Sequence, residues 1–211
     1  MKEKLCPVEK ECGGCCYLAD GYEEQLRKKR KKVAKLLGKY CQVKPIHGME
    51  EPYYYRNKVH AVVAQNSQKE LYTGIYKAKT HKVVPVEACL LEDETADKII
   101  RSVKMLARTF RLQAYDEDRH TGLLRHILVR AAKETGEYML VLVMAKDFFE
   151  GEDEFLEALL TLHPELKTVI FNVNCKDTTF VLGERERVVF GDGYIVDELN
   201  GMKFRISAKS F

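Results

Sequence analysis

A group of cysteines at the beginning of the chain constrains its structure more than any other feature. Cys6, Cys12 and Cys15 fall within ten residues, separated by five and then two intervening positions. Two glycines lie between the last two cysteines and permit a tight turn that lets sulfur atoms converge. An N-terminal segment frays unless something ties it down. The pattern predicts that these three thiolates, together with the distant Cys89, hold one metal centre.

Four sulfur ligands are compatible with zinc or with an iron–sulfur cluster. Structural zinc sites usually pair their ligands as two short Cys-x-x-Cys segments, whereas here Cys89 stands alone. The pattern therefore favours an iron–sulfur cluster over zinc, and either of them over unligated thiols. Cys16 is a bystander, or replaces Cys15 if the register of the loop differs. Cys41 and Cys175 have no neighbouring base and are expected to be structural thiols.

Positive charge is concentrated in one segment. The 211 residues carry 35 Lys or Arg and 32 Asp or Glu, a formal charge of +3. Residues 22–40 hold eight Lys or Arg against two Glu, so the remainder of the chain is slightly acidic. Such a run is either a solvated helix face or a surface for RNA phosphates, and the sequence leaves both open.

The sequence carries no sign of export or of a membrane. No apolar run approaches the roughly 20 residues that span a bilayer, and no charged and then apolar leader precedes the first cysteine. Seven cysteines, an odd number concentrated near one end, do not resemble a disulfide framework and suit a reducing compartment. We expect a soluble, cytoplasmic protein with no membrane partner.

Strands are predicted to outnumber helices. Helices are expected over residues 20–37, 92–111 and 152–162, the first capped by Asp20 and closed by Gly38. Strands are expected at residues 57–65, 71–77, 81–86, 124–133, 137–146, 167–174, 178–182, 188–190, 193–199 and 202–207. Runs of strands with few helices predict an α+β fold: a mostly antiparallel sheet, a few flanking helices and the N-terminal iron–sulfur loop.

Motifs spread along nearly the whole chain resemble one enzyme family. They are Cys6-Pro7, Cys12-Gly13-Gly14-Cys15, residues 22–29, Tyr55-Arg56-Asn57-Lys58-Val59, residues 84–89, residues 121–126, residues 171–174, Leu182-Gly183, Phe190-Gly191 and residues 206–211. In this order they resemble the RNA (uracil-5-)-methyltransferases that carry a 4Fe-4S cluster, the 23S rRNA type. The resemblance implies RNA as partner, with 23S rRNA as the substrate, and S-adenosylmethionine as methyl donor of the full-length enzyme.

The chain departs from the family pattern at both ends. It starts at the cysteines without the family's small RNA-binding β-barrel, and it stops at Phe211, where family members continue into the S-adenosylmethionine domain. The family's nucleophilic cysteine and Gly-rich donor loop have no counterpart in these residues, and the Gly-x-Gly at residues 191–193 is expected to be a hairpin turn. We therefore expect no catalytic or donor-binding residue here, and no activity from the fragment alone.

The resemblance also implies domain boundaries. Residues 1–19 form the iron–sulfur loop, and residues 20–51 form a basic helix and connection that pack on the methyltransferase domain in the family. Residues 52–207 form a central α+β RNA-binding domain, and residues 208–211 start the missing domain. Surface exposed by an absent domain makes self-association of the fragment a further expectation.

Two groups of side chains are candidates for RNA contact. Tyr55, Arg56, Asn57 and Lys58 supply a ring, a fork-shaped cation, an amide and an ammonium just before a strand. Arg125 and His126 open another strand. Without the resemblance, tyrosines at a strand start would be packing residues, Arg125 an ion-pair partner and His126 a half-buried histidine.

Two other functions compete with the methyltransferase hypothesis. One is a zinc-stapled, non-enzymatic RNA-binding module, and the other is a redox sensor without affinity for RNA. Methylation of uracil involves no net redox change, so a cluster is expected to be structural or to position RNA.

Overall fold

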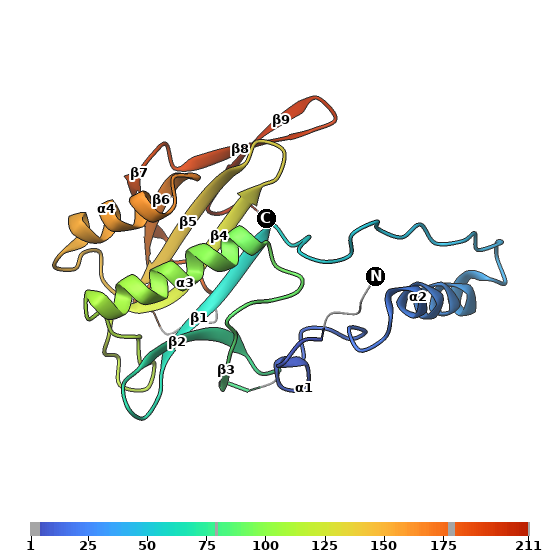
Figure 1. The fold of residues 1–211 in the computed structure, drawn as a ribbon, viewed down its shortest axis with the longest axis horizontal. Helices are drawn as coiled ribbons and strands as arrows, with labels where there is room; N and C mark the ends of the chain where they lie inside the picture. Colours follow the sequence, from blue (N-terminus) through green and yellow to red (C-terminus); the bar gives the residue numbers. More distant parts are fainter. Residues whose placement is uncertain (1–4, 79, 177–179, 211) are drawn as a thin grey trace.

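A seven-stranded sheet forms the centre of the molecule, in a computed structural model that describes residues 5–78, 80–176 and 180–210 (Figure 1). Its strands are β1 (Lys58–Gln65), β2 (Leu71–Tyr76), β3 (Val83–Pro85), β4 (Leu124–Ala132), β5 (Glu137–Met144), β6 (Leu166–Val173) and β7 (Arg185–Phe190). They lie in the order β3-β2-β1-β4-β5-β6-β7. Only the β5–β6 pair among them is parallel, because a helix connects these two strands. The predicted α+β fold with a mostly antiparallel sheet is confirmed.

Two helices cover one face of this sheet. Figure 1 shows α3 (Glu94–Thr109) and α4 (Glu152–Leu162) side by side across the strands. The main core lies beneath them, where alternate side chains of β1, Val59, Ala61 and Val63, meet the apolar stripes of the helices. Burial on that face determines the register of the strands, because a shift by one residue would turn these side chains to the other face.

A two-stranded sheet lies on the opposite face. β8 (Tyr194–Leu199) and β9 (Met202–Ser207) form the hairpin predicted from Asn200-Gly201, and Asn200 has a φ of 51° there. Ile195 of β8 packs against a second apolar cluster that includes Leu128 and Met139. The central sheet is therefore covered on both faces over β4 to β6.

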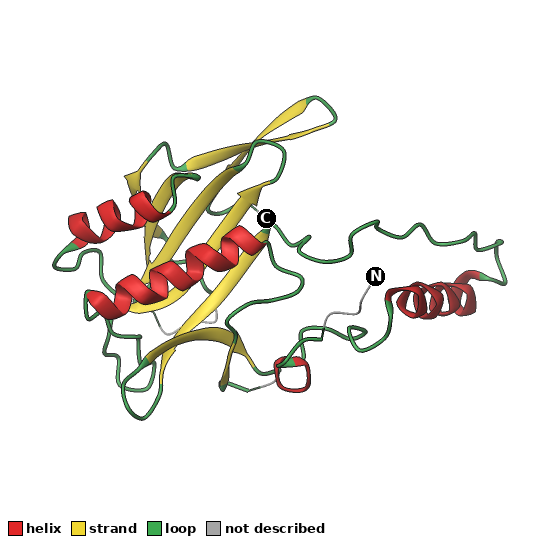
Figure 2. Cartoon of the chain, in the orientation of Figure 1, coloured by secondary structure: helices red, strands yellow, loops and turns green. Residues whose placement is uncertain are grey.

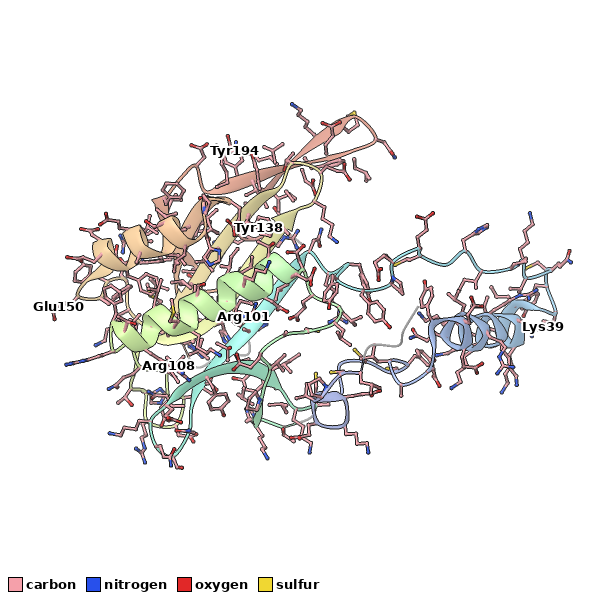
Figure 3. All side chains as sticks on the ribbon, in the orientation of Figure 1. Lys39, Arg101, Arg108, Tyr138, Glu150 and Tyr194 are labelled. Atoms are coloured by element: carbon pink, nitrogen blue, oxygen red, sulfur yellow. The ribbon has the colours of Figure 1, made fainter. Side chains whose placement is uncertain are left out.

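The N-terminal part extends away from the sheet. It contains α1 (Glu9–Cys12) and α2 (Tyr22–Leu37), joined to the body by long irregular segments (Figure 2). No residue of α2 is buried, and the Tyr22 hydroxyl accepts a hydrogen bond from the Met49 amide at 2.7 Å. Lys39 lies at the end of the molecule farthest from the sheet (Figure 3). No helix in the described part of the chain is long and apolar enough to cross a bilayer.

Some predicted boundaries were wrong. Asp20 does not cap α2, which begins at Tyr22, and the Asp20 carboxylate pairs instead with Lys28 at 2.6 Å. The strand predicted at residues 178–182 is not found at residues 180–182, and residues 178–179 lie outside the described residues. The four-residue helix α1 was not predicted, since it is too short to show helical periodicity.

Asp93 caps α3, and its replacement by alanine is expected to destabilise the fold. Its carboxylate accepts hydrogen bonds from the amides of Thr95 and Ala96, both at 3.0 Å, and from the Tyr138 hydroxyl. Loss of such a cap costs about 1 kcal/mol. Urea unfolding of Asp93→Ala should show this decrease, whereas Asp153→Ala, at an exposed position in the first turn of α4, should change stability by less than about 0.5 kcal/mol. Equal losses in both variants would contradict the capping role.

Candidate functional site

Two neighbouring cysteines and a third that is distant in sequence line one cavity. Cys12, Cys15 and Cys89 surround a space of about 50 Å³ between the N-terminal segment and the edge of the sheet. Cys6 lies close enough for its charge to act on the Cys15 thiol. These four cysteines are half-buried, whereas Cys16, Cys41 and Cys175 are exposed, and all seven thiols are free. Burial thus separates the four predicted ligands from Cys16, the predicted bystander, and from Cys41 and Cys175, the predicted structural thiols.

The glycines of the cysteine loop have specific roles. Gly13 ends α1 in the left-handed conformation, with φ of 66°, and so turns the chain between Cys12 and Cys15. A side chain on Gly14 would place its Cβ 3.3 Å from the Cys12 sulfur. The tight turn inferred from the sequence is therefore present.

Helix α3 holds the other side of the cavity in place. The Asp97 carboxylate accepts a hydrogen bond from the Cys89 amide at 2.9 Å. Arg101, labelled on α3 in Figure 3, donates to the Glu87 carbonyl at 2.9 Å, and Lys104 pairs with the Glu87 carboxylate at 2.6 Å. These contacts position Cys89 opposite the N-terminal thiols.

Burial governs the electrostatics of this cavity. It raises the pKa of the Cys89 thiol to about 11 and also raises the pKa of Cys15, although the Arg56 guanidinium opposes the second shift. Burial and the neighbouring Asp97 raise the pKa of Glu92 to about 7. Burial therefore favours the protonated form of the Cys15 and Cys89 thiols, and a metal bound by these two sulfurs would displace their protons.

The residues around the cavity fit a sulfur-ligated group. In the described part of the chain, no three His, Cys, Asp or Glu side chains converge closely enough to hold a single metal ion. The structure thus does not show a metal centre, and the cluster stays a prediction. Four half-buried thiols near one cavity, with the Arg56 guanidinium to offset thiolate charge, nevertheless form a donor set suited to iron–sulfur or zinc.

Tyr55 and Arg56 lie beside the cysteines. Both line a pocket of about 220 Å³ that also receives Cys15, other tyrosine rings and Lys29 from α2. The amides of Tyr54 and Arg56 donate to the carbonyls of Leu90 and Leu91, so this segment runs along the residues that follow Cys89. The pocket combines aromatic rings, on which unpaired RNA bases can stack, with cations, which can contact phosphates.

The other two residues of this predicted group lie at the start of β1. The Asn57 side chain is exposed, and burial, reinforced by Arg130, lowers the pKa of Lys58.

Arg125 and His126 lie in a different pocket. A β-bulge between Leu124 and His126 turns both side chains toward the face of the sheet opposite α3. There they line a pocket of about 300 Å³, which we call the Arg125 pocket. Its other walls include Tyr76, His81, Tyr115 and Glu117. The two predicted RNA-binding groups are therefore not brought together.

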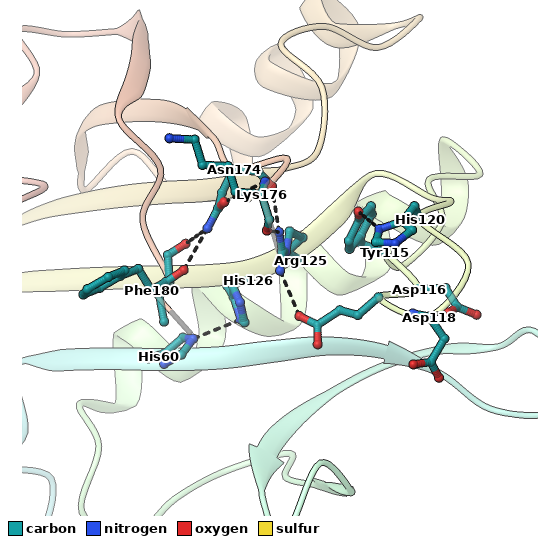
Figure 4. A network of polar contacts seen from close by, with 12 residues as sticks. His60, Tyr115, Asp116, Asp118, His120, Arg125, His126, Asn174, Lys176 and Phe180 are labelled. Atoms are coloured by element: carbon teal, nitrogen blue, oxygen red, sulfur yellow. Dashed lines mark hydrogen bonds and ion pairs between the residues drawn. The ribbon is translucent and has the colours of Figure 1, made fainter. Parts of the chain in front are cut away.

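A pair of histidines, drawn in Figure 4, lies between the Arg125 pocket, which His126 lines, and the cysteine cavity, which His60 lines. His60 Nε2 lies 3.2 Å from His126 Nδ1, and burial lowers their pKa values to about 4 and about 3. His60 also lines the cysteine cavity. The sequence reasoning missed His60, although the alternation of β1 gives it the same orientation as Val62 in the Arg125 pocket. It also missed Tyr115 and Glu117, for which the sequence carried no signal.

The histidine pair predicts a loss of stability in acid. The unfolded chain binds protons near the ordinary histidine pKa of about 6.5, whereas the folded pair resists them. The contribution of the neutral pair to the free energy of unfolding is therefore fully present above about pH 6.5. It is lost as the pH drops toward 4, by up to about 1.4 kcal/mol per pH unit for each histidine.

Urea unfolding between pH 7 and pH 4.5 measures this effect. Glu92 acts in the opposite direction, because its raised pKa favours proton uptake by the folded state, so the informative quantity is a difference between variants. The double variant His60→Gln/His126→Gln cannot titrate at these positions and should show a weaker acid loss than the parent. Identical slopes would contradict the assignment.

The chain is similar over nearly all its residues to several bacterial proteins. It is 38% identical over 214 residues to an uncharacterised RNA methyltransferase of Halalkalibacterium halodurans, a match that covers 99% of this chain and 46% of the relative. It is 35% identical over 215 residues to an uncharacterised RNA methyltransferase of Bacillus cereus, a match that covers 100% of this chain and 46% of the relative. For one of Clostridium acetobutylicum the identity is 36% over 216 residues, covering 99% and 47%. The chain thus spans about half the length of the curated relatives it matches. No family model matches it.

A solved structure shares the fold. The chain superposes with a TM-score of 0.70 on the crystal structure of Pyrococcus abyssi tRNA (uracil-54, C5)-methyltransferase in complex with S-adenosyl-L-homocysteine. The match covers 90% of this chain and 44% of that chain, with 19% sequence identity. At this identity the likeness shows the fold alone.

Proposed function

We propose that these 211 residues are the RNA-binding, cluster-bearing part of an S-adenosylmethionine-dependent RNA (uracil-5-)-methyltransferase that acts on 23S rRNA. The observation that carries the proposal is the 38% identity, over nearly all of this chain, to a relative named an RNA methyltransferase. The uracil-5 specificity is supported by the fold shared with a tRNA (uracil-54, C5)-methyltransferase. The 23S rRNA target is supported by the motif resemblance alone.

The proposal assigns RNA contact to two groups of side chains. Tyr55 and Arg56 line the pocket of rings and cations next to the cysteines, Asn57 and Lys58 follow them at the start of β1, and Arg125 and His126 lie in the Arg125 pocket. The exposed basic side chains of α2 would add contacts to phosphates, which carry no sequence information. The domain boundaries at residues 19, 51 and 207 belong to the same proposal.

Cys6, Cys12, Cys15 and Cys89 would hold a 4Fe-4S cluster. The half-burial of all four and the cavity that Cys12, Cys15 and Cys89 line support this assignment. When bound, the cluster would tie the N-terminal segment to the edge of the sheet. The chain's own residues then hold Arg56 and Tyr55 beside it, through the pairing of residues 54–56 with residues 90–93. The role of the cluster in this proposal is structural and positions the RNA-binding pocket.

The proposal separates RNA binding from methyl transfer. Cys41 and Cys175 are exposed, and neither lines the Arg125 pocket or the pocket beside Tyr55 and Arg56, so the proposal assigns neither as a nucleophile. The named relatives are about twice as long as this chain. We therefore expect the 211 residues to bind RNA without transferring a methyl group.

The proposal is tested in two steps. Disrupting the gene in its host should remove one 5-methyluridine from 23S rRNA, as measured by nucleoside mass spectrometry, and the intact gene should restore it. The 211-residue protein should bind 23S rRNA fragments at low salt, with an affinity that falls as salt rises. An unchanged 5-methyluridine content would contradict the enzymatic part, and binding with zinc but no iron would favour the non-enzymatic RNA-binding module.

A further inference from the structure

We infer that the Arg125 pocket binds one unstacked guanine base of the RNA substrate, at a site separate from that of the methylated uridine. The inference rests on the proposed RNA-binding function and adds a base preference to it. With a volume of about 300 Å³, the pocket has the size of a small-molecule site, for which roughly 300–1,000 Å³ is typical.

Arg125 supplies the hydrogen-bond donors that a ligand in this pocket would meet. Its side chain is 4% exposed, and its Nη1 donates to the carbonyls of Asn174 and Lys176 at 2.8 and 3.0 Å. Its Nη2 donates to Glu117 at 2.8 Å. Because a guanidinium has five N–H donors, two remain on the side that carries Nε and Nη2. Nε is buried without a hydrogen-bond partner among the described residues, an arrangement that is costly unless a ligand completes it.

The wall of the pocket is formed before any ligand arrives. Asp116 exchanges backbone hydrogen bonds with Thr121, and its carboxylate accepts from the amides of Asp118 and Arg119, both at 3.0 Å. Gly122, with φ of 93°, passes so close to the Ala114 carbonyl that a Cβ would lie 2.1 Å from its oxygen. A rigid wall reduces the entropy lost when a ligand binds.

The charges at the rim exclude a phosphate as the ligand. Asp116, Glu117 and Asp118 all line the pocket, and only Arg125 among its lining residues carries a fixed positive charge. Burial lowers the pKa values of His126 and of His60 behind it to about 3 and about 4, so this pair adds no positive charge at neutral pH. Carboxylates repel an anion but accept hydrogen bonds from amino and ring N–H groups. The ligand is therefore neutral and carries both donors and acceptors.

Guanine meets these requirements. Its O6 and N7 are adjacent acceptors that suit the two free donors of an arginine, and its amino group is a donor for a carboxylate. Tyr76 and Tyr115 add rings to the same pocket, and the Arg125 guanidinium lies 4.7 Å from the centre of the Tyr115 ring. Unpaired RNA bases are commonly held by such rings and guanidinium planes.

The test measures binding of a short single-stranded RNA with one guanosine to the 211-residue protein at fixed salt. Replacing that guanosine by 7-deazaguanosine, which lacks N7, should weaken binding roughly fivefold, and adenosine should weaken it further. Tyr76→Leu should weaken binding roughly tenfold through lost stacking. Tyr76→Phe, which keeps the ring, should bind within twofold of the parent.

Arg125→Lys provides a second variant, since lysine keeps the charge but lacks the fork. It should abolish the preference for guanosine over 7-deazaguanosine. Because Arg125 also holds two backbone carbonyls, this variant can lose its fold, and the Tyr76 variants then decide alone.

The outcomes separate this inference from the proposed function. Tight RNA binding that ignores both the guanosine replacement and Tyr76→Leu would overturn the guanine site and leave the RNA-binding function intact. If no RNA binds at low salt, the proposed function fails. The pocket is then tested by itself: guanosine is added to the protein, and the imidazole resonances of His126 are followed by NMR. A shift with guanosine but not uridine supports the pocket, and no shift overturns it.

Discussion

Replacing Cys89 by serine is expected to remove the iron from anaerobically reconstituted protein. The parent should hold about four iron atoms per chain with brown thiolate-to-iron absorption, and the variant fewer than about one. Cys89 is the ligand candidate on the sheet side of the cavity, opposite Cys12 and Cys15, so its loss leaves the N-terminal thiols without a partner there. Iron analysis and absorption spectra measure the effect.

Matched controls come from the exposed cysteines. Cys175→Ser and Cys16→Ser change thiols that are exposed to solvent, and both variants should keep the iron of the parent. Loss of iron in Cys16→Ser with retention in Cys15→Ser would show that Cys16 is the ligand instead. Full iron content in Cys89→Ser would refute the four-cysteine site.

Phe155→Ala is expected to be the most damaging single change in the core. The ring is 0% exposed and contacts two others edge-on, with centroids 5.6 Å from Phe110 and 5.5 Å from Phe149. Truncation leaves a cavity between α4, α3 and the sheet, at a cost of about 3–5 kcal/mol. Urea unfolding followed by circular dichroism should show a free energy of unfolding that is lower by this amount. The midpoint should fall accordingly, with little change in the dependence of the free energy on urea concentration.

Phe148→Ala is the matched control. This phenylalanine is 67% exposed, so its truncation should change the free energy of unfolding by less than about 0.5 kcal/mol. Similar losses in the two variants would contradict the core assignment of Phe155.

Local patterns predicted most of the secondary structure. The helix over residues 152–162 and the strand over residues 202–207 have the predicted bounds, and the hairpin at Glu134-Thr135-Gly136 joins β4 to β5 as expected. Helical periodicity, strand alternation and turn residues act over a few neighbouring positions, so a linear sequence displays them directly.

The candidate site was only partly predictable. The cysteines were found because they are rare and closely spaced, and the structure brings Cys89 to the cavity lined by Cys12 and Cys15. The sequence made Arg56, Arg125 and His126 candidates for RNA contact, but it could not show that Arg125 and His126 line a different pocket from Arg56.

By itself the sequence determined the α+β class, the positions of most strands and helices, and which residue types were available for sulfur ligation. Tertiary structure alone decided that a bulge turns Arg125 and His126 to one face, that His60 bridges two regions, and that Tyr115 joins Arg125. These arrangements depend on strand register and on packing between distant segments. The energy of each such contact is gained only when the whole sheet has formed, so no short stretch of sequence can reveal it.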